Sequence, residues 1–346
     1  MRQGYSRHFG VCTRECQSSG ARARSSRKTS TFLRTSALLL LYQLISVLAS
    51  RIHTHYTRRG VSPFLTFAKI GKHGRLGNQL FQIAATIGVA ETQGFVWKFP
   101  TTISETEAGR LFQLSGSFEL KLTNLTFIEE ADEIFDHIDL NSHITSHKSS
   151  ATPPVGLSLH GYYQSLKYFE KHIEHIAKLL RVPNEYKKRV LTAHPEIESK
   201  NCVTIHVRRG DYYDLAHIYN VLSTRYYIEA LAQIPEVEHV IVVSDDIPWC
   251  RQHIGPIIKV PASYSNFTNQ LDDFVLLYLG QHVIIANSTF SWWAAFLRHI
   301  HRSQIYPSST FRRKTIAPKV WFNPTGNLKH LNNRSMYLES WIVIDY

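Results

Sequence analysis

Two arginines and an acid follow a short apolar run in the second half of the chain. The stretch HVRRGDYY, at residues 206–213, leads from the run CVTIHV directly into Arg208, Arg209 and Asp211. Alternating apolar and polar residues at 203–207 predict a half-buried strand, so the arginines come where this strand ends. Because a planar guanidinium suits phosphate oxygens, we predict an anionic ligand here. The alternative is a structural ion pair with Asp211 or Asp214.

Two further polar clusters come directly after apolar runs. Asp245 and Asp246 follow the run at 239–244, where carboxylates either accept hydrogen bonds from a nucleoside or form an ordinary turn. The stretch NSTFS, at 287–291, places hydroxyls and free backbone N–H groups at the expected start of a helix, which favours negative charge. Capping explains only one of these hydroxyls. We therefore predict phosphate binding by Asn287, Ser288, Thr289 and Ser291.

Other residues with chemical potential receive simpler interpretations. His206 lies on the expected strand and is interpreted as a hydrogen-bonded core residue, and Trp292 and Trp293 are interpreted as core packing. The acid pairs do not have the D-x-D spacing of a metal-bridged nucleotide-sugar site, and no zinc-type spacing occurs. We therefore predict that no metal or other cofactor is required.

A glycine-containing stretch, GRLGNQLFQ, occupies residues 74–82. It lacks both the G-x-G-x-x-G of dinucleotide binders and the Lys-Ser/Thr of a P-loop. Gly74 and Gly77 allow close approach of the backbone, and Asn78 is the expected cap of a helix over 79–93.

The elements that must position these clusters alternate regularly after residue 195. Strands and helices follow one another at short spacing, which predicts a parallel sheet with helices on its faces. Ligands bind beyond the carboxyl ends of such strands, so all three polar clusters are expected at one edge. Between residues 95 and 200 the signal is weaker. The expected strands are 64–70, 203–207, 239–244, 257–260, 282–286 and 304–306, and the expected helices are 79–93, 166–180, 224–233, 249–254, 270–280 and 290–300.

The N-terminal residues predict a membrane attachment. The formal net charge of the 346 residues is +12, and residues 1–34 hold eight basic residues against Glu15 alone. Residues 35–50 carry no charge, and as a helix they span about 24 Å, short of the ~30 Å hydrocarbon core. We predict a basic cytoplasmic tail (1–34), a signal-anchor helix (35–50) and a stem (51–63), with a cleaved signal peptide as the alternative. Basic residues in the remainder are dispersed, so nucleic acid is not an expected partner.

Features of a secretory location are present but not decisive. N-glycosylation sequons begin at Asn124, Asn266, Asn287 and Asn333. Cys202 and Cys250 either form a disulfide or are buried and reduced, and the sequence leaves both alternatives open.

Four motifs together resemble the α-1,2-fucosyltransferases of glycosyltransferase family 11. They are GRLGNQLFQIAA, HVRRGDYY, VVSDDIPWC and IIANSTFSWWAAFL, and the resemblance covers about residues 67–310. It implies two Rossmann-like domains facing a cleft (GT-B type), with an acceptor-side domain at 64–200 and a GDP-fucose-binding domain at 201–346. It also implies an inverting, metal-free transfer of fucose from GDP-fucose to the 2-hydroxyl of a galactose-terminated glycan, by a single-pass type II protein of the Golgi membrane.

The resemblance also implies roles for individual residues. Arg208 becomes the leading contact to the diphosphate, and Arg209 and Asp211 shape its loop. A fucosyltransferase of another linkage and a basic polyanion-binding protein remain as alternatives. The general base is left open among Asp211, Asp214 and Asp245. The other implied donor contacts are His206, Asp245, Asp246 and the residues from Ser288 to Ser291.

Overall fold

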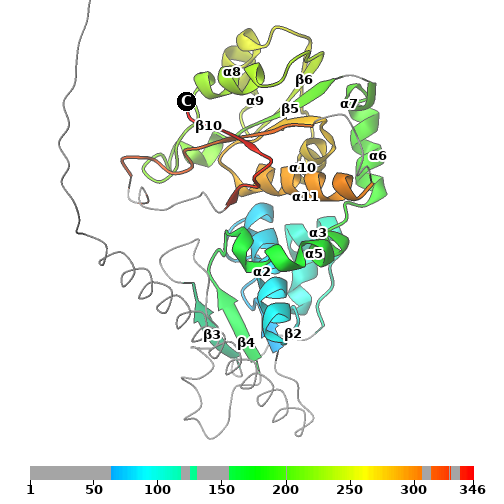
Figure 1. The fold of residues 1–346 in the computed structure, drawn as a ribbon, viewed down its shortest axis with the longest axis vertical. Helices are drawn as coiled ribbons and strands as arrows, with labels where there is room; N and C mark the ends of the chain where they lie inside the picture. Colours follow the sequence, from blue (N-terminus) through cyan, green and yellow to red (C-terminus); the bar gives the residue numbers. More distant parts are fainter. Residues whose placement is uncertain are drawn as a thin grey trace, which may run out of the picture. The chain divides into compact units, whose positions relative to one another are not determined.

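The computed structural model describes residues 64–117, 125–130, 156–199, 201–305, 313–326, 328 and 336–346 (Figure 1). The predicted tail, signal anchor and stem lie outside these residues, as do the sequons at Asn124 and Asn333. Across the described ranges, no helix combines the length and the apolar character needed to cross a membrane.

The first sheet is parallel and has the strand order β2-β1-β4-β3. Helix α2 (Leu76–Gln93) follows its strand β1 and ends at Gly94, whose φ of 73° provides the predicted left-handed stop. The predicted start at residue 79 is wrong, because Arg75 rather than Asn78 occupies the N-cap position. The strands are β1 (Phe64–Thr66), β2 (Val96–Trp97), β3 (Leu125–Glu129) and β4 (Gly156–His160).

Short helices connect the two sheets. The single helix predicted at 166–180 is instead two 3-10 turns followed by α5 (Ile173–Leu179). The break places the buried ring of Phe169 on Trp293, with ring centroids 5.6 Å apart and planes 18° from parallel. The remaining elements are η1 (Thr101–Glu105), α3 (Glu107–Phe112), η4 (Leu166–Tyr168), η5 (Glu170–His172), α6 (Asn184–Ala193) and α7 (Glu196–Ser199).

The second sheet is also parallel, which confirms the predicted parallel α/β architecture. Its strand order is β10-β9-β8-β5-β6-β7. From β5 the chain moves toward β6 and β7, whereas from β8 it moves toward β9 and β10, so the direction reverses between β5 and β8. Ligands of such sheets bind in the crevice at this reversal. The strands are β5 (Cys202–Val207), β6 (His239–Ser244), β7 (Ala262–Tyr264), β8 (His282–Ile284), β9 (Thr315–Pro318) and β10 (Ile342–Ile344).

Three details of the predicted strands are wrong. All six residues of β5 are buried rather than half of them, because this strand is central and parallel sheets are covered on both faces. The apolar run at 257–260 begins in the 3-10 turn η7 (Gly255–Ile257), which contains Pro256, and the edge strand β7 comes later. Residues 304 and 305 belong to α11 (Thr289–Ile305) instead of a strand. The other helical elements are η6 (Gly210–Tyr212), α8 (Thr224–Ala232), α9 (Ile247–His253) and α10 (Gln270–Leu279).

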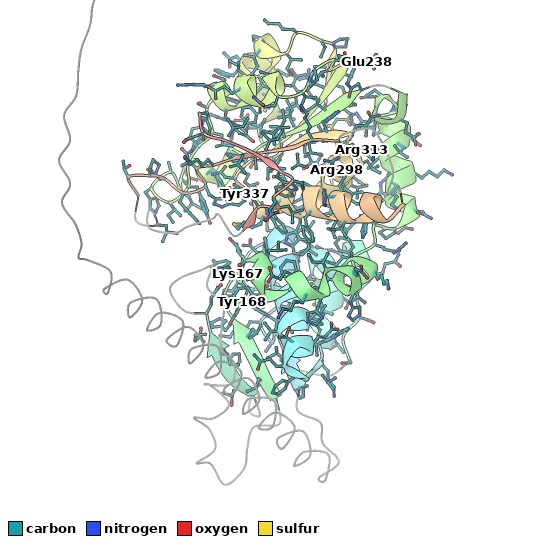
Figure 2. The ribbon with its side chains drawn as sticks, in the orientation of Figure 1. Lys167, Tyr168, Glu238, Arg298, Arg313 and Tyr337 are labelled. Atoms are coloured by element: carbon teal, nitrogen blue, oxygen red, sulfur yellow. The ribbon has the colours of Figure 1, made fainter. Side chains whose placement is uncertain are left out.

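Helices α2 and α11 pack against each other and join the two sheets (Figure 1). Trp292 and Trp293 are fully buried, which confirms their predicted place in the core, and Phe81 of α2 lies 4.6 and 5.2 Å from their rings. Arg298, labelled in Figure 2, donates hydrogen bonds to the carbonyls of Gln281 and Lys314 and so fixes α11 to the sheet. Because one hydrophobic cluster includes residues of both sheets, the domain boundary at residue 200 stays a prediction.

The two cysteines of the described residues are both free and buried. Burial raises the pKa of the Cys202 thiol to about 12 and that of the Cys250 thiol to about 11. Both are therefore neutral core residues, and the disulfide alternative does not hold.

Candidate active site

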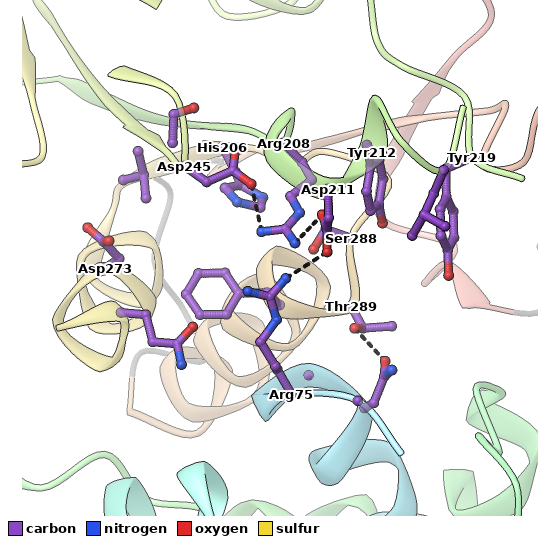
Figure 3. A pocket seen from close by; sticks show the side chains of 18 of the residues that line it. Arg75, His206, Arg208, Asp211, Tyr212, Tyr219, Asp245, Asp273, Ser288 and Thr289 are labelled. Atoms are coloured by element: carbon purple, nitrogen blue, oxygen red, sulfur yellow. Dashed lines mark hydrogen bonds and ion pairs between the residues drawn. The ribbon is translucent and has the colours of Figure 1, made fainter. Parts of the chain in front are cut away.

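A pocket lies at the carboxyl edge of the second sheet, at the reversal between β5 and β8 (Figure 3). It encloses about 290 Å³, near the lower end of the roughly 300–1,000 Å³ common for small-molecule sites. The three predicted clusters each contribute to it, which confirms that they share one edge. The side of the first sheet contributes Gly74, Arg75, Gly77, Asn78 and Gln164, and the second sheet contributes mainly His206, Arg208, Asp211, Tyr212, Tyr219, Asp245, Asp273, Ser288 and Thr289.

Arg208 is fixed in the pocket by two carboxylates. Its Nη1 lies 2.8 Å from Asp245 Oδ2, and its Nη2 lies 2.5 Å from Asp211 Oδ1. The other oxygen of Asp211 lies 3.0 Å from Nη2 of Arg75, which comes from the loop before α2 (Figure 3). The predicted ion pair is thus present, yet a guanidinium has five N–H donors and retains some for a ligand. Sequence reasoning missed Arg75, although it stands within the glycine-containing motif.

Arg209 points away from the pocket. Its guanidinium carbon lies 3.4 Å from the ring centroid of Trp249, and its backbone N–H donates to Asp245 at 2.9 Å. Asp246 accepts a hydrogen bond from the Trp249 backbone N–H at 3.1 Å and caps α9. Neither side chain lines the pocket, so both support the strand-end loops rather than face a ligand. The opposite orientation of Arg208 and Arg209 agrees with strand alternation.

His206 is buried, as predicted for a core residue, but within the described part of the chain one of its ring nitrogens lacks the predicted hydrogen bond. It is 4% exposed and lines the pocket, and its Nδ1 atom is buried without a hydrogen-bond partner among the described residues. Burial, and secondarily the charge of Arg208, lowers the pKa of His206 to about 3, so the imidazole is neutral. A buried polar atom without a partner is costly, and this atom is therefore a candidate contact for a bound ligand.

The start of α11 contributes less than the sequence suggested. Thr289 lines the pocket, but its hydroxyl donates to Asn78 Oδ1 at 2.8 Å. The Ser291 hydroxyl is buried and donates to the carbonyl of Ser288 at 3.3 Å, and the buried Asn287 amide donates to two backbone carbonyls. Of these residues at the start of α11, only Ser288 brings to the pocket a hydroxyl for which the described residues provide no hydrogen-bond partner. Burial also makes Asn287 unsuitable for glycosylation, whereas Asn266 is exposed.

Gly77, in the first turn of α2, explains why the motif at residues 74–82 needs glycine. A Cβ atom at this position would lie 2.4 Å from the carbonyl carbon of Thr289, so Gly77 permits the close approach of α2 to the start of α11. Asn78 is not the predicted cap. Its side chain instead accepts hydrogen bonds from Thr289 and, at 3.0 Å, from Gln164, and thereby joins the two sides of the pocket.

Asp273 is a pocket residue that sequence reasoning did not select. Its carboxyl accepts a hydrogen bond from Ser265, yet burial raises its pKa to about 6. Asp214, by contrast, is exposed and does not line the pocket. Of the three predicted bases, this leaves Asp211 and Asp245, and both are engaged by arginines. Within the described part of the chain, no group of three or more His, Cys, Asp or Glu residues is arranged to hold a metal ion.

A partly buried carboxylate supports the loop that carries Gln164. Glu130 accepts hydrogen bonds from the backbone N–H groups of Tyr162 at 2.5 Å and Tyr163 at 2.8 Å. Burial outweighs these bonds and raises the pKa of Glu130 to about 7. The folded protein therefore holds this proton up to a higher pH than the unfolded chain does.

The stability of the protein should consequently decrease as pH rises. The contribution of the Glu130 proton is fully present below the ordinary pKa of 4.5 and is lost as pH passes about 7. For the wild-type chain we expect the contribution of Glu130 to the free energy of unfolding to fall by about 2 kcal/mol as pH rises from 5.5 to 8. Urea unfolding of wild type and Glu130→Gln at several pH values measures this. Parallel pH profiles for the two proteins would contradict it.

The fold and the pocket together define an α/β protein with a pocket at the carboxyl ends of a parallel sheet. If the strands β5 to β10 are numbered 1 to 6 in chain order, the order across the second sheet from β7 to β10 is 3-2-1-4-5-6. This is the strand order of dinucleotide-binding folds. Two arginines, a helix start and an unpaired imidazole make the pocket suitable for an anion.

Comparison with known proteins then identifies the family. The model of the family described as Glycosyl transferase family 11 matches residues 40–314, and the chain belongs to this family of enzymes. An alpha-1,2-colitosyltransferase of Escherichia coli is 27% identical over 300 residues, which cover 79% of this chain and 97% of that one. A galactoside 2-alpha-L-fucosyltransferase of Caenorhabditis elegans is 30% identical over 158 residues, 42% of this chain and 43% of that one. The chain is thus a fucosyltransferase-like glycosyltransferase, as its motifs predicted.

Among solved structures, the fucosyltransferase NodZ from Bradyrhizobium is similar to 68% of this chain and is itself covered over 92% of its length. The TM-score is 0.40 and the sequence identity is 14%.

Proposed function

We propose that the protein is an inverting α-1,2-fucosyltransferase that transfers fucose from GDP-fucose to the 2-hydroxyl of a terminal galactose. The observation that carries this proposal is the position of Arg208, fixed by two carboxylates beside Arg75 and the start of α11. Membership in family 11 supplies the reaction class. The similarity to a galactoside 2-alpha-L-fucosyltransferase supports the linkage, and the predicted Golgi type II topology belongs to the same proposal.

The pocket suits a nucleotide sugar in one orientation. Asp273 and Tyr219 lie at opposite ends of it, and the arginines lie between them (Figure 3). Guanine presents N1–H and amino donors, which a carboxylate accepts, so we place the base at Asp273. The diphosphate then lies at Arg208, and the fucosyl group extends toward Tyr219.

In this orientation the pocket stabilises the leaving group. The acceptor oxygen bonds to the anomeric carbon of fucose while the bond from that carbon to the β-phosphate oxygen breaks, so charge grows on the phosphate. The proton of the acceptor hydroxyl passes to a general base, for which Asp211 and Asp245 are the remaining candidates. Donors placed in advance from Arg208, the Ser288 hydroxyl and the backbone at the start of α11 favour this charge. Asp211 competes with the diphosphate for both arginines, so we expect donor binding to separate Asp211 from Arg75.

A linkage-resolved transfer assay tests the proposed function. The full chain is incubated with GDP-fucose and a panel of terminal galactosides, with and without a chelator, and the product linkage is determined by NMR. We expect an α-1,2 product that forms equally well with chelator present. GDP-colitose serves as a second donor, because a relative that is covered over 97% of its length is a colitosyltransferase. A different linkage, or transfer from GDP-colitose only, would refute the respective part of the proposal.

Donor binding should weaken in acid through Asp273. Its pKa of about 6 means that the carboxylate needed for guanine is lost as pH falls through this value. We expect the affinity of the wild type for GDP-fucose to fall below pH 6. Asp273→Asn should bind about tenfold more weakly at pH 7.5, the loss of one charged hydrogen bond, and show little further change. GDP-fucose is the suitable probe, because its phosphates do not titrate in this range. If the affinity of Asp273→Asn falls below pH 6 as steeply as that of the wild type, this role of Asp273 is excluded.

A further inference from the structure

A second group of polar and aromatic side chains lies at the carboxyl edge of the first sheet. Glu129 ends β3, His160 ends β4, and Lys69 and His73 follow β1. Since β4 pairs with both β1 and β3, these strand ends are neighbours. Such an edge is where parallel α/β sheets bind ligands, and the donor pocket of the second sheet does not account for this group.

The hydrogen bonds in this group define its protonation. Glu129 Oε2 lies 2.5 Å from Nδ1 of His160. Because the carboxylate can only accept, this nitrogen carries the ring proton and donates a hydrogen bond to Glu129. Nε2 of His160 lies 3.5 Å from the Lys69 ammonium, which can only donate, and 2.8 Å from Nε2 of His73. Nε2 of His160 is therefore the acceptor, and His73 donates to it. This assignment leaves His73 Nδ1 with a lone pair, and no hydrogen bond among the described residues occupies it.

The pKa of His73 agrees with this assignment. Burial, then the neighbouring His160 and Lys69, lowers its pKa below the ordinary value of 6.5, while Glu129 acts in the opposite direction. The imidazole of His73 is thus neutral at physiological pH, and its Nδ1 can accept a hydrogen bond from a hydroxyl group.

An exposed aromatic ring lies beside His73. Tyr162 is 42% exposed, and its ring centroid lies 6.4 Å from that of His73, at 75° between the planes. The two hydrogen bonds to Glu130 hold its loop, and Tyr163 adopts a φ of 53°, which a residue other than glycine rarely takes. The fold therefore presents Tyr162 to solvent in a fixed place instead of burying it.

This group is continuous with the donor pocket. Gly74, next to His73, and Gln164, two residues after Tyr162, both line that pocket. Gln82 of α2 joins the two loops, because its side-chain amide donates to the carbonyl of His73 at 3.0 Å and to that of Gly161 at 3.2 Å. A ligand on this group would therefore lie next to a donor in the pocket.

We propose that His73 and Tyr162 form the binding site for the acceptor sugar, a β-linked galactoside. The ring of Tyr162 packs against the face of galactose that carries its C–H groups, and Nδ1 of His73 accepts a hydrogen bond from a hydroxyl. Glu129 and His160 are positioning residues that keep His73 in the required tautomer. This inference rests on the proposed function for its acceptor, and it assigns that acceptor to particular residues.

Steady-state kinetics of Tyr162→Ala and His73→Ala test the assignment. We expect the KM for the galactoside to rise about tenfold or more in each variant, a loss near 1.4 kcal/mol. The KM for GDP-fucose and the acceptor-independent hydrolysis of GDP-fucose should stay at wild-type values, which a misfolded variant would not achieve. Matched controls are His175→Gln, which removes another His–Glu pair, and Ile228→Ala, which truncates another half-exposed side chain. His175 pairs with Glu91 at the far end of α2, about 20 Å from its first turn.

The possible failures can be told apart. An unchanged galactoside KM in both variants, with normal transfer by the wild type, would overturn the acceptor site and leave the proposed function intact. Absence of any transfer by the wild type would count against the proposed function. In that case, saturation-transfer NMR of a β-galactoside with the full chain and GDP decides on the site itself. Signal that Tyr162→Ala abolishes supports the site, and absence of signal from the wild type rejects it.

Discussion

Replacement of Arg208 by Ala is expected to reduce kcat/KM for transfer by roughly 10³-fold, the upper range for loss of one preorganised donor to a developing oxyanion. Arg208 comes from the end of the central strand β5 and is only 15% exposed at its side chain, so solvent has little access to its position. GDP affinity should fall as well, because the ground state already carries the diphosphate charge. Steady-state kinetics and calorimetric titration with GDP measure the two effects.

The matched control for this variant is Arg209→Ala. Both residues follow β5, but Arg209 stacks on Trp249 outside the pocket. We expect Arg209→Ala to lower stability through lost packing while GDP affinity changes much less than in Arg208→Ala. Arg208→Lys should recover little, because a compact ammonium lacks the planar fork whose two nitrogens contact Asp211 and Asp245 separately. Equal GDP affinities for Arg208→Ala and the wild type would contradict the placement of the diphosphate.

Replacement of Gly77 by Ala should have the second largest effect. The added methyl group would lie 2.4 Å from backbone at Thr289, and backbone cannot rotate aside as a side chain does. Helix α2 and the start of α11 must separate, which is expected to cost about 1–3 kcal/mol of stability. Because both helices line the pocket, a displacement near 1 Å should also reduce kcat/KM by about 100-fold. Thermal unfolding and kinetics of the variant measure these changes.

Gly88 on the same helix provides the control. A Cβ atom there would lie 2.4 Å from the carbonyl oxygen of Tyr168, a contact of similar severity at a distance from the pocket. Gly88→Ala should therefore lose comparable stability yet keep the kcat/KM of the wild type at a temperature where it remains folded. If Gly77→Ala and Gly88→Ala lose kcat/KM equally, general destabilisation rather than pocket geometry is responsible.

The second sheet and the shared edge of the polar clusters could be predicted because they depend on local sequence. Strong strand-helix alternation fixes parallel pairing, and carboxyl ends of parallel strands meet without further information. The exact boundaries depended on tertiary contacts. The apolar run at 257–260, which suggested a strand, begins in the turn that contains Pro256, and the helix predicted at 166–180 breaks where the ring of Phe169 packs on Trp293.

The composition of the site was less predictable because it combines side chains from distant parts of the chain. Arg75 acquires its role only through Asp211, 136 residues later. Asn78 looked like a helix cap, yet it joins Gln164 to Thr289. Arg208 differs from Arg209 in the direction of its side chain at the strand end. The sequence predicts that successive side chains point to opposite faces of the sheet, but it does not show on which face the pocket opens.

The group of side chains proposed to bind the acceptor sugar could not be anticipated either, because it also combines residues from distant parts of the chain. Its members come from the ends of β1, β3 and β4, and those at β3 and β4 lie in a part of the chain with weak periodicity and no motif. Only the strand order β2-β1-β4-β3 brings them together.

A crystal structure of the full chain with GDP tests the central claim most directly. We expect the β-phosphate within hydrogen-bond distance of Arg208 and the Ser288 hydroxyl, guanine at Asp273, and Asp211 no longer in contact with Arg75. A diphosphate bound elsewhere, with Arg208 still held by both carboxylates and His206 Nδ1 still unpaired, would contradict the account.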